Sequence, residues 1–495
     1  MTTPPLLLVH CLLAVFLALT VTAASNDSKS TTTTTTNHKH GHGDKALTGR
    51  FIHVTDFHLD EDYKEGSSDK ELCHRGKGDA GVYGAVKTDC DSSPELIRMT
   101  FDFIRNKIGD VDFVIYTGDS ARHDRDDDFP RTKKQVVSAQ EAIVKHFTDT
   151  FDTDKIKVLP VIGNNDVIDH NQCGANDDDF KVIQNIWKPL GLNTTDDFEY
   201  GGYLVEDVVP GKIRTIHTNT LLFYKDNDAI KDDCDKKGSV GANHIKWIKQ
   251  VLDDSRKQGY SVYILAHIPP TSKKDKPYYT SACTEEYFTL LGEYEDVIAA
   301  HFAGHYNNDI LSAMVKKHGK YEQVSALAKK KKKKQFKKMD LEHSNFITPL
   351  FNTPSVIPTF NPSIRVFEYD TEGKEYPVGT IRDWWQYYLD LQGTDNGRSK
   401  DVEYELEYQA SELFNVDHFD GAGIQKVFGR MKEDEDLHEE YIEHATVSTS
   451  KDKKKDKKKH KHKDDDEDND DDDDDEDEED EDEDEDEDDD DEDED

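Results

Sequence analysis

Residues 50–58 read RFIHVTDFH, a β-rich run that ends in an acid and a histidine two residues apart. Similar short runs end in polar residues at six later points of the chain: 111–119, 156–166, 213–220, 260–270, 297–309 and 363–370. Helical patterns lie between several of them, at 93–108 and 244–258, and Ser93-Pro94 is a typical cap and first helical residue. Strands separated by helices predict an α/β fold with a largely buried sheet.

Chemically active side chains gather at the ends of these strand runs. In open α/β sheets the loops beyond the carboxyl ends of the strands converge on one crevice, so residues there can act together. The residues concerned are Asp56, His58, Asp119, Asn164, His267, His305 and Asn307. Carboxylate, imidazole and amide-oxygen groups suit borderline-to-hard divalent ions, and no cysteine belongs to the set. We therefore predict a metal site at the strand ends; the alternatives are satisfied polar core residues or one structural metal.

The order of these motifs resembles the calcineurin-like metallophosphoesterase superfamily, whose pattern is D-x-H, GD, GN-[H]-[DE], H and GH-x-H. The resemblance covers roughly residues 50–310. More closely, the stretches GRFIHVTDFHLDEDY, YTGDSARHDRD, VIGNNDVIDHNQC and AGHYNND look like those of the endopolyphosphatases of fungal vacuoles, in the acid-sphingomyelinase-like branch. This likeness implies a β-sandwich flanked by helices, in α/β/β/α layers, with residues 363–369 as a final sheet element and disordered charged tails.

The resemblance also implies two divalent ions as cofactors, with Mn, Mg, Co, Zn and Fe all open as their identity. Two ions about 3.5–4 Å apart need one shared ligand and private ligands on each side. By resemblance Asp119 is the shared ligand. The private ligands are Asp56 and His58 on the first metal, and on the second Asn164, His267 and His305. A hydroxide between the ions, its pKa lowered by both charges, would attack phosphorus in line with the leaving oxygen.

Two positions depart from the superfamily pattern. Asn307 stands where the last motif normally has a second His, and its amide oxygen can still ligate the first metal as a weaker neutral donor. Asn165 stands where many relatives have a His that protonates the leaving group, which asparagine cannot do. The loss matters little when the leaving group is a phosphate, as in a phosphoanhydride. Both departures also occur in the endopolyphosphatase-like pattern, so the resemblance favours an endopolyphosphatase over a sphingomyelinase.

Further candidate catalytic residues lie in the same loops. The forked donors of Arg122 suit a phosphate oxygen, or equally an ion pair with Asp124 or Asp126. His123 or His170 could supply a proton.

The acidity of the chain is concentrated at its C-terminus. The 495 residues include 106 acids against 63 Lys and Arg, a formal net charge of −43, but residues 464–495 hold 31 of these acids and no base. The remainder has a net charge of −12. Contact with DNA or RNA needs a basic surface, so we expect no nucleic-acid partner.

Residues 6–24 are almost entirely apolar, a length that suits a cleaved signal peptide or an uncleaved signal-anchor. Both place the chain in the secretory pathway, secreted or as a single-pass type II membrane protein, and the fungal likeness implies the vacuole lumen. Sequons at Asn26 and Asn193 agree with a glycoprotein. We expect some disulfides among the five later cysteines, at least one of which is left free or pairs intermolecularly: Cys73, Cys90, Cys173, Cys234 and Cys283.

We expect four parts along the chain: a signal peptide or signal-anchor at 1–24, a disordered Ser/Thr/His stalk at 25–48, a catalytic domain at 49–445, and a disordered Lys-rich then Asp/Glu-rich tail at 446–495. A Lys-rich insertion at about 316–345 interrupts the catalytic domain. It is either a solvated loop or, through Lys329–Lys338, a segment that holds the substrate chain.

The sequence thus predicts an endopolyphosphatase that hydrolyses internal phosphoanhydride bonds of inorganic polyphosphate. The alternatives are a sphingomyelinase-like phosphodiesterase and a non-catalytic polyanion-binding protein. Any membrane contact is expected through the N-terminal segment alone, and the oligomeric state stays open.

Overall fold

The computed structural model describes residues 47–273, 276–327, 336, 339–341, 343–394, 398 and 401–449. The predicted leader, almost all of the stalk, the lysines between 329 and 338 and the acidic tail lie outside these residues. The described residues from Leu47 onward belong to one compact unit. Within the described ranges, no helix is both long enough and apolar enough to cross a membrane.

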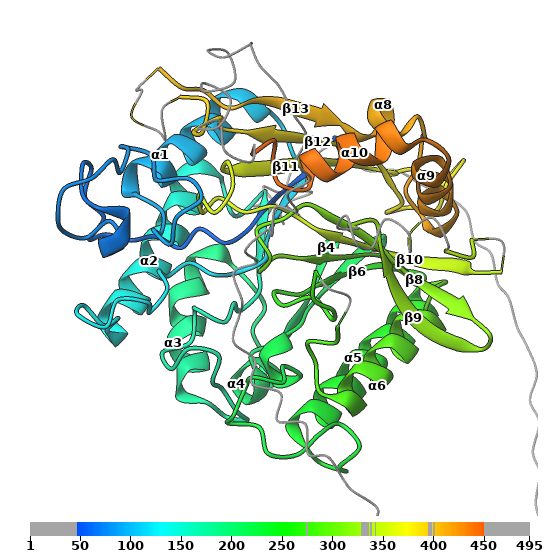
Figure 1. Cartoon of the computed structure of the whole chain (residues 1–495). Helices are drawn as coiled ribbons and strands as arrows, with labels where there is room; N and C mark the ends of the chain where they lie inside the picture. The colour runs from blue at the N-terminus through cyan, green and yellow to red at the C-terminus, as the bar shows by residue number, and fades with distance from the viewer. Residues whose placement is uncertain are drawn as a thin grey trace, which may run out of the picture. The chain divides into compact units, whose positions relative to one another are not determined.

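Two mixed β-sheets carry the fold (Figure 1). The first has the strand order β13-β12-β11-β1-β2-β3, with bounds β1 Arg50–Val54, β2 Phe113–Tyr116, β3 Lys157–Pro160, β11 Ser363–Tyr369, β12 Ile381–Tyr388 and β13 Glu405–Gln409. The second has the order β4-β5-β6-β7-β10-β8-β9, with bounds β4 Leu204–Val209, β5 Ile213–His217, β6 Ser261–Leu265, β7 Ile298–Ala303, β8 Ile310–Lys317, β9 Lys320–Ser325 and β10 Asn345–Asn352. Each of the seven predicted strand runs contains a strand, so those predictions are confirmed.

The helices of the described chain are α1 Pro94–Phe103, α2 Lys133–Thr150, α3 Asp178–Trp187, α4 Asp196–Gly201, α5 Val240–Gln258, α6 Ser281–Glu293, α8 Ala410–Phe414, α9 Gly421–Glu433 and α10 Glu435–His444. Four further short helical segments are η1 Asp69–Glu71, η2 Ile104–Ile108, η3 Lys188–Leu190 and η4 Thr220–Leu222. Helix α1 begins as predicted, because the Ser93 hydroxyl accepts a hydrogen bond from the Leu96 N–H and Pro94 occupies the first turn.

Aromatic side chains fill the space between the two sheets. Phe51 of β1 stacks on Phe113 of β2 with ring centroids 4.8 Å apart, and its ring meets Phe302 of the second sheet edge-on at 5.5 Å. Because side chains alternate along a strand, Ile52 and Val54 point to the opposite face, where they belong to the core that includes α1 and α2. Helices α5 and α6 lie against the second sheet (Figure 1). The predicted α/β/β/α layering is confirmed.

The C-terminal half contains more strand than the sequence indicated. The predicted insertion at 316–345 begins inside β8, and residues 320–325 form β9, which pairs antiparallel with β8. The first part of this segment is therefore a β-hairpin and not a solvated loop. Tyr321 and Val324 are the apolar residues of β9 and stand three positions apart, so the strand lacks the alternating pattern that would have predicted it. As the edge strand of its sheet, β9 can be largely polar.

Two disulfides close loops around the sheets. Cys73 pairs with Cys90 in the long connection after β1, and Cys234 pairs with Cys283 at the start of α6. Cys173 is buried and has no disulfide partner among the described residues. The prediction of some paired cysteines and one left over is confirmed, with a pairing that the sequence left open.

Candidate metal centre

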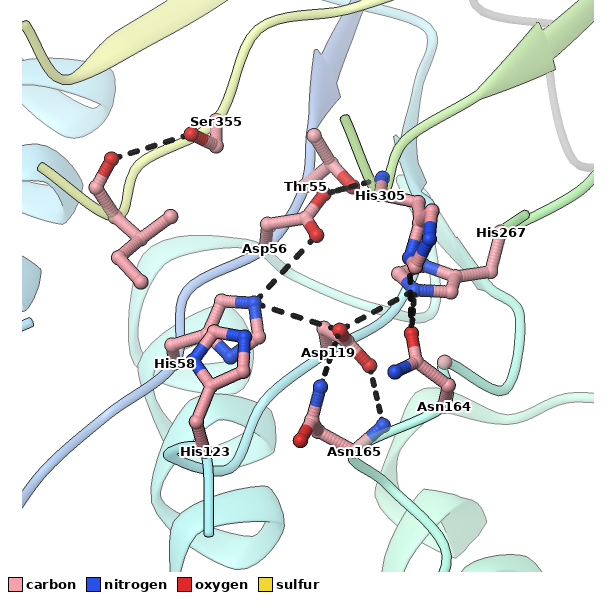
Figure 2. A network of polar contacts seen from close by, with 12 residues as sticks. Thr55, Asp56, His58, Asp119, His123, Asn164, Asn165, His267, His305 and Ser355 are labelled. Atoms are coloured by element: carbon pink, nitrogen blue, oxygen red, sulfur yellow. Dashed lines mark hydrogen bonds and ion pairs between the residues drawn. The ribbon is translucent and has the colours of Figure 1, made fainter. Parts of the chain in front are cut away.

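The predicted ligand residues come together where strands of both sheets end. Figure 2 shows Asp56, His58 and Asp119 from the first sheet facing Asn164, His267 and His305. Backbone hydrogen bonds join the loops that carry them. The Asp56 N–H donates to Gly118 O at 2.9 Å, and the Gly304 N–H donates to His267 O at 3.1 Å. These bonds fix the loops relative to one another, so the side chains of five separate strand ends share one site.

Five of these residues have left-handed backbone conformations. The φ angles are 51° for Asp56, 42° for His58, 62° for Asp119, 72° for His305 and 58° for Asn307. Such angles are uncommon outside glycine and persist only where the surrounding structure enforces them. Strain of this kind clusters at functional sites, where it holds side chains in positions that relaxed loops would not give them.

Two motif glycines allow the loops to approach so closely. A Cβ on Gly163 would overlap the Asp119 carboxylate and its backbone nitrogen, and a Cβ on Gly304 would overlap Thr55 and Asp56. Any larger residue at either position would push the candidate ligands apart. The glycines of the GN and GH motifs are thus explained by space at the site.

The close-packed side chains form two groups that could each hold a metal ion. Asp56, His58 and Asp119 make one, and Asp119, His267 and His305 make the other. In each group the ligand atoms lie within 4.8 Å of one another. Asp119 belongs to both, and its Oδ2 lies 3.4 Å from His58 Nε2 and 3.2 Å from His267 Nε2. One carboxylate between two groups is the arrangement that a pair of ions requires.

Two of the candidate ligands each have a buried side-chain oxygen that lacks a hydrogen-bond partner among the residues that the structure describes. These oxygens are Oδ1 of Asp56 and Oδ1 of Asn307. A buried polar atom without a partner is costly, so each such atom calls for an explanation. A divalent cation is a suitable partner for both, because carboxylate and amide oxygens are ligands that such ions accept. The donor set therefore fits a metal centre.

On the other side of Asp119, the side-chain oxygen of Asn164 is already surrounded. His267 Nε2 lies 2.7 Å from Asn164 Oδ1, and His305 Nδ1 lies 3.0 Å from it. The Asn164 amide nitrogen donates instead to His170 Nε2 at 2.9 Å. The amide is thereby oriented with its oxygen toward the candidate ligands.

Backbone carbonyls set the orientation of two imidazoles. His58 donates from Nδ1 to Ala121 O at 3.1 Å, and His267 donates from Nδ1 to Thr117 O at 2.6 Å. In both rings Nε2 is therefore left facing Asp119. Ligating histidines are commonly held in this way, through the ring nitrogen that does not touch the metal.

Charge is strongly coupled across the cluster. Burial alone would lower the pKa of His267, but the charge and hydrogen bond of Asp119, together with the charge of Asp56 and the Thr117 carbonyl, raise that pKa to about 9. Burial likewise opposes the charged form of Asp119, yet His267 and His58 keep the pKa of its carboxyl well below the ordinary value. Burial lowers the pKa of His305 to about 3, with the charge of His267 adding to the effect. Asp119 is thus a carboxylate and His305 a neutral imidazole, the forms that bind metal.

The structure adds supporting residues that sequence reasoning missed. Asn165 donates to both Asp119 oxygens, from its backbone N–H at 2.7 Å and from its side-chain amide at 2.9 Å. Arg131 holds Asn165 in turn, with Nη1 donating to the Asn165 side-chain oxygen at 3.3 Å. The buried Asp166 carboxylate accepts the N–H groups of Asp119, Ser120 and Gly163. Asp166 could have been found as the last residue of the GNND motif, whereas no motif marks Arg131.

The side chain of Arg122 is buried and hydrogen-bonded to backbone carbonyls. Its side chain is 3% exposed, and its guanidinium donates to the carbonyls of His123 and Phe129, each at 2.9 Å. The nearest acid is Asp60 at 4.0 Å, not Asp124 or Asp126. Two of its donors thus hold the loop after Asp119, and a catalytic role for Arg122 stays a prediction.

His123 and His170 border the cluster. The His123 ring stacks on His58 with centroids 4.0 Å apart, and its Nδ1 lies 2.6 Å from the Asp91 carboxylate (Figure 2). Asp91 also accepts the His123 backbone N–H at 2.9 Å. These two bonds fix the ring, and Nε2 is the ring nitrogen that Asp91 does not contact. His170 meets the cluster through the hydrogen bond from the Asn164 amide nitrogen.

Comparison with known proteins agrees with this geometry. The model of the family described as calcineurin-like phosphoesterase matches residues 49–307. An endopolyphosphatase of Neurospora crassa is 35% identical over 275 residues, which cover 54% of this chain and 38% of that protein. One of Kluyveromyces lactis is 32% identical over 391 residues, covering 66% of this chain and 56% of that protein.

The chain therefore spans less than two thirds of the length of these relatives. The structure of a dimetal phosphatase from Danio rerio aligns with 72% of this chain and with 98% of its own chain. The sequence identity is 11% and the TM-score is 0.38, so this superposition is too loose to bear on function. The family match spans more than half of the chain and contains the motif residues from Asp56 to Asn307. The chain belongs to the calcineurin-like phosphoesterase family.

Proposed function

We propose that this chain is a metal-dependent endopolyphosphatase, which hydrolyses internal phosphoanhydride bonds of inorganic polyphosphate. The observation that carries the proposal is the pair of candidate metal groups that share Asp119. The names of the relatives from Neurospora crassa and Kluyveromyces lactis support the same activity.

Each side chain has a defined task in this proposal. Asp119 is the ligand common to both ions. The first ion is held by Asp56, His58 and Asn307, and the second by Asn164, His267 and His305. Two bound divalent ions, from among Mn, Mg, Co, Zn and Fe, would lower the pKa of the attacking water and offset the charge of the phosphate oxygens.

The residue at position 165 supports an anhydride substrate. The Asn165 amide donates to Asp119 and cannot release a proton to a leaving group. A phosphate leaves as a stable anion and needs little help of this kind, whereas an alkoxide needs a proton. Asn165 thus serves the reaction by holding the shared carboxylate. If a proton is supplied, His123 and His170 are the nearest imidazoles beside the ligands.

A second candidate function is supported by one observation. The Asp91–His123 pair resembles the carboxylate–imidazole arrangement of many general acids, because Asp91 fixes one ring nitrogen and leaves the other available. Such a pair could protonate an alkoxide, so a phosphodiesterase of the sphingomyelinase-like type is the alternative. A polyanion-binding protein without activity is the third possibility, and only an assay separates it from the others.

We further propose that the enzyme works in the vacuole lumen, with membrane contact through the N-terminal segment alone. The two disulfides support an oxidising compartment on the secretory route. Asn193 is exposed and followed by Thr194 and Thr195, which supports glycosylation at that position.

The decisive experiment offers the purified full chain long-chain polyphosphate and, separately, bis-nitrophenyl phosphate, with each of the five divalent ions. Endopolyphosphatase activity predicts a ladder of intermediate chain lengths on a gel before orthophosphate accumulates. Orthophosphate without intermediates would indicate cutting from the chain end. Faster turnover of the diester would favour the phosphodiesterase, and no turnover with any ion would leave the binding protein.

A further inference from the structure

The last described residues of the chain contact two loops that lead to the candidate metal centre. Residues 441–449, here called the strap, comprise the end of α10 and the five residues after it. Four of its side chains are buried: Tyr441, Ala445, Val447 and Thr449. These buried side chains tie the segment to the body of the fold.

The first contact is with the loop that carries Asn307. The Asn308 side chain donates to Ala445 O at 2.9 Å, and the Asp309 N–H donates to the same carbonyl at 3.2 Å. The Tyr441 hydroxyl accepts from the Leu311 N–H at 2.8 Å and donates to Asp309 O at 3.3 Å. The residues directly after Asn307 are therefore fixed by the strap.

The second contact is with the loop between β10 and β11. Asn361 donates from its side chain to Val447 O at 3.1 Å and from its backbone to the Thr449 hydroxyl at 3.0 Å. The same loop reaches Asp56, another ligand proposed for the first metal, because the Ile357 N–H donates to Asp56 O at 2.9 Å. The strap thus supports the backbone positions of both Asn307 and Asp56.

The strap holds an unfavourable backbone conformation. Val447 has φ 50° and Ser448 has φ 48°. A β-branched residue is rarely found in the left-handed region, and it stays there only where contacts over-determine it. Ser448 is held by a hydrogen bond from its hydroxyl to Glu407 at 2.7 Å, and Val447 by Asn361. The turn aims the carbonyls of residues 445 and 447 at the two loops.

A buried ion pair anchors the Asn307 loop from its other side. The Asp309 carboxylate lies 2.7 Å from Arg365 Nη2 and accepts a hydrogen bond from the Tyr408 hydroxyl. Asp309 and Arg365 are both 1% exposed. The loop is therefore clamped between the first sheet and the strap, and its position depends on both.

We propose that the strap is a positioning element for the first metal, which holds Asn307 and Asp56 at ligating distance. The inference rests on the proposed metal centre. His267 and Asn164 of the second site are oriented by Thr117, His170 and each other, without a hydrogen bond from the strap among the described residues. Loss of the strap should therefore weaken the first site more than the second.

The test measures the thermal unfolding of the full chain over a series of Mn²⁺ concentrations. Ions that bind folded and unfolded chains equally, as on the acidic tail, do not shift Tm, so the shift reports the folded sites. We expect Tyr441→Phe to need roughly tenfold more Mn²⁺ than the parent for the same rise in Tm from the weaker site, as for other residues that orient metal ligands. Half-maximal activity should move to higher Mn²⁺ by the same factor.

Tyr263→Phe is the matched control. Its buried hydroxyl donates to Gly379 O at 2.7 Å between the sheets, so the variant loses the same kind of bond away from the strap. It should lower Tm without metal but leave the Mn²⁺ dependence at the parent's value. Equal Mn²⁺ shifts in the two variants would reduce the Tyr441 effect to general destabilisation and overturn the proposal.

Two truncations and one double variant complete the test. Removing 445–495 should shift the Mn²⁺ dependence, whereas removing 450–495 should not; if the longer deletion does not fold, Tyr441→Phe decides alone. In an Asn307→Ala background, Tyr441→Phe should cause little further shift, since both act on one site. If Mn²⁺ does not change the Tm of the parent, the proposed metal centre itself is contradicted. If Mn²⁺ raises the Tm of the parent and of the strap variants at the same concentrations, only the proposed role of the strap is contradicted.

Discussion

The two sides of Asp119 are built differently. On the second-metal side, the oxygen of Asn164 is already contacted by His267 and His305. On the first-metal side, one oxygen each of Asp56 and Asn307 is buried without a hydrogen-bond partner in the described part of the chain. The difference teaches that the second site is preorganised by its own side chains. The first depends more on a bound cation and on chain segments far away in the sequence.

The largest effect should follow from removing the residue that both sides share. Asp119→Asn takes a charged ligand from both ions, and His267→Ala takes one from the second. We expect each to lower kcat/KM by on the order of a thousandfold, as when other transition-state charge stabilisers are lost. Steady-state kinetics with saturating metal, beside circular dichroism to establish folding, measures this. Near-normal activity in either variant would contradict a dinuclear centre.

Removal of metal should act next in size. A chelator is expected to abolish activity and to lower Tm, because a ligand present at 100 times its Kd stabilises the folded state by about 2.7 kcal/mol. Adding back Mn²⁺ should restore the second site at lower concentration than the first. A single, steep recovery would show that the two sides fill together and that the contrast between them is unfounded.

A change of ligand type should affect the first side alone. Asn307→His replaces a neutral amide oxygen by an imidazole, a stronger donor for zinc-like ions. We expect Zn²⁺ to bind the first site more tightly and the second site as before. Zn²⁺ titrations followed by activity and by Tm should therefore move to lower concentration. Superimposable titrations of variant and parent would exclude Asn307 as a ligand.

The smallest expected effect is on the pH dependence of stability, through His74. His74 lies between Asp60 at 3.0 Å and Asp126 at 2.7 Å. The hydrogen bond to Asp60 raises the pKa of His74, burial opposes this, and Asp126 adds to it. Because the folded-state pKa lies above the unfolded value, this stabilisation is complete below about pH 6.5 and is lost as pH rises through the folded-state pKa.

We therefore expect Tm of the parent to fall as pH rises above neutrality, and His74→Gln to flatten that part of the profile by a few degrees or less. Thermal unfolding from pH 5 to 9 measures it. Parallel profiles of the two proteins would remove His74 as the cause.

The sequence by itself determined the candidate ligands and the strands that carry them. Each ligand stands in a short motif directly after a β-rich run, so the local pattern indicates both the strand and the residue at its end. The glycines of the same motifs are equally local, because they answer to the space between neighbouring loops. Seven strands could be predicted for this reason, whereas the α/β/β/α layering was implied by the family resemblance.

Only the tertiary structure decided which distant residues hold these ligands in place. Arg131 supports Asn165, Arg365 pairs with Asp309, and the strap reaches both loops of the first site. Arg122 was a candidate for phosphate binding by its place in the sequence, and in the structure its guanidinium donates to backbone carbonyls. The physical reason is the separation in sequence. A hydrogen bond or ion pair between residues tens to hundreds of positions apart leaves no periodic pattern or motif in the sequence. It forms only when the two sheets and residues 441–449 have packed together.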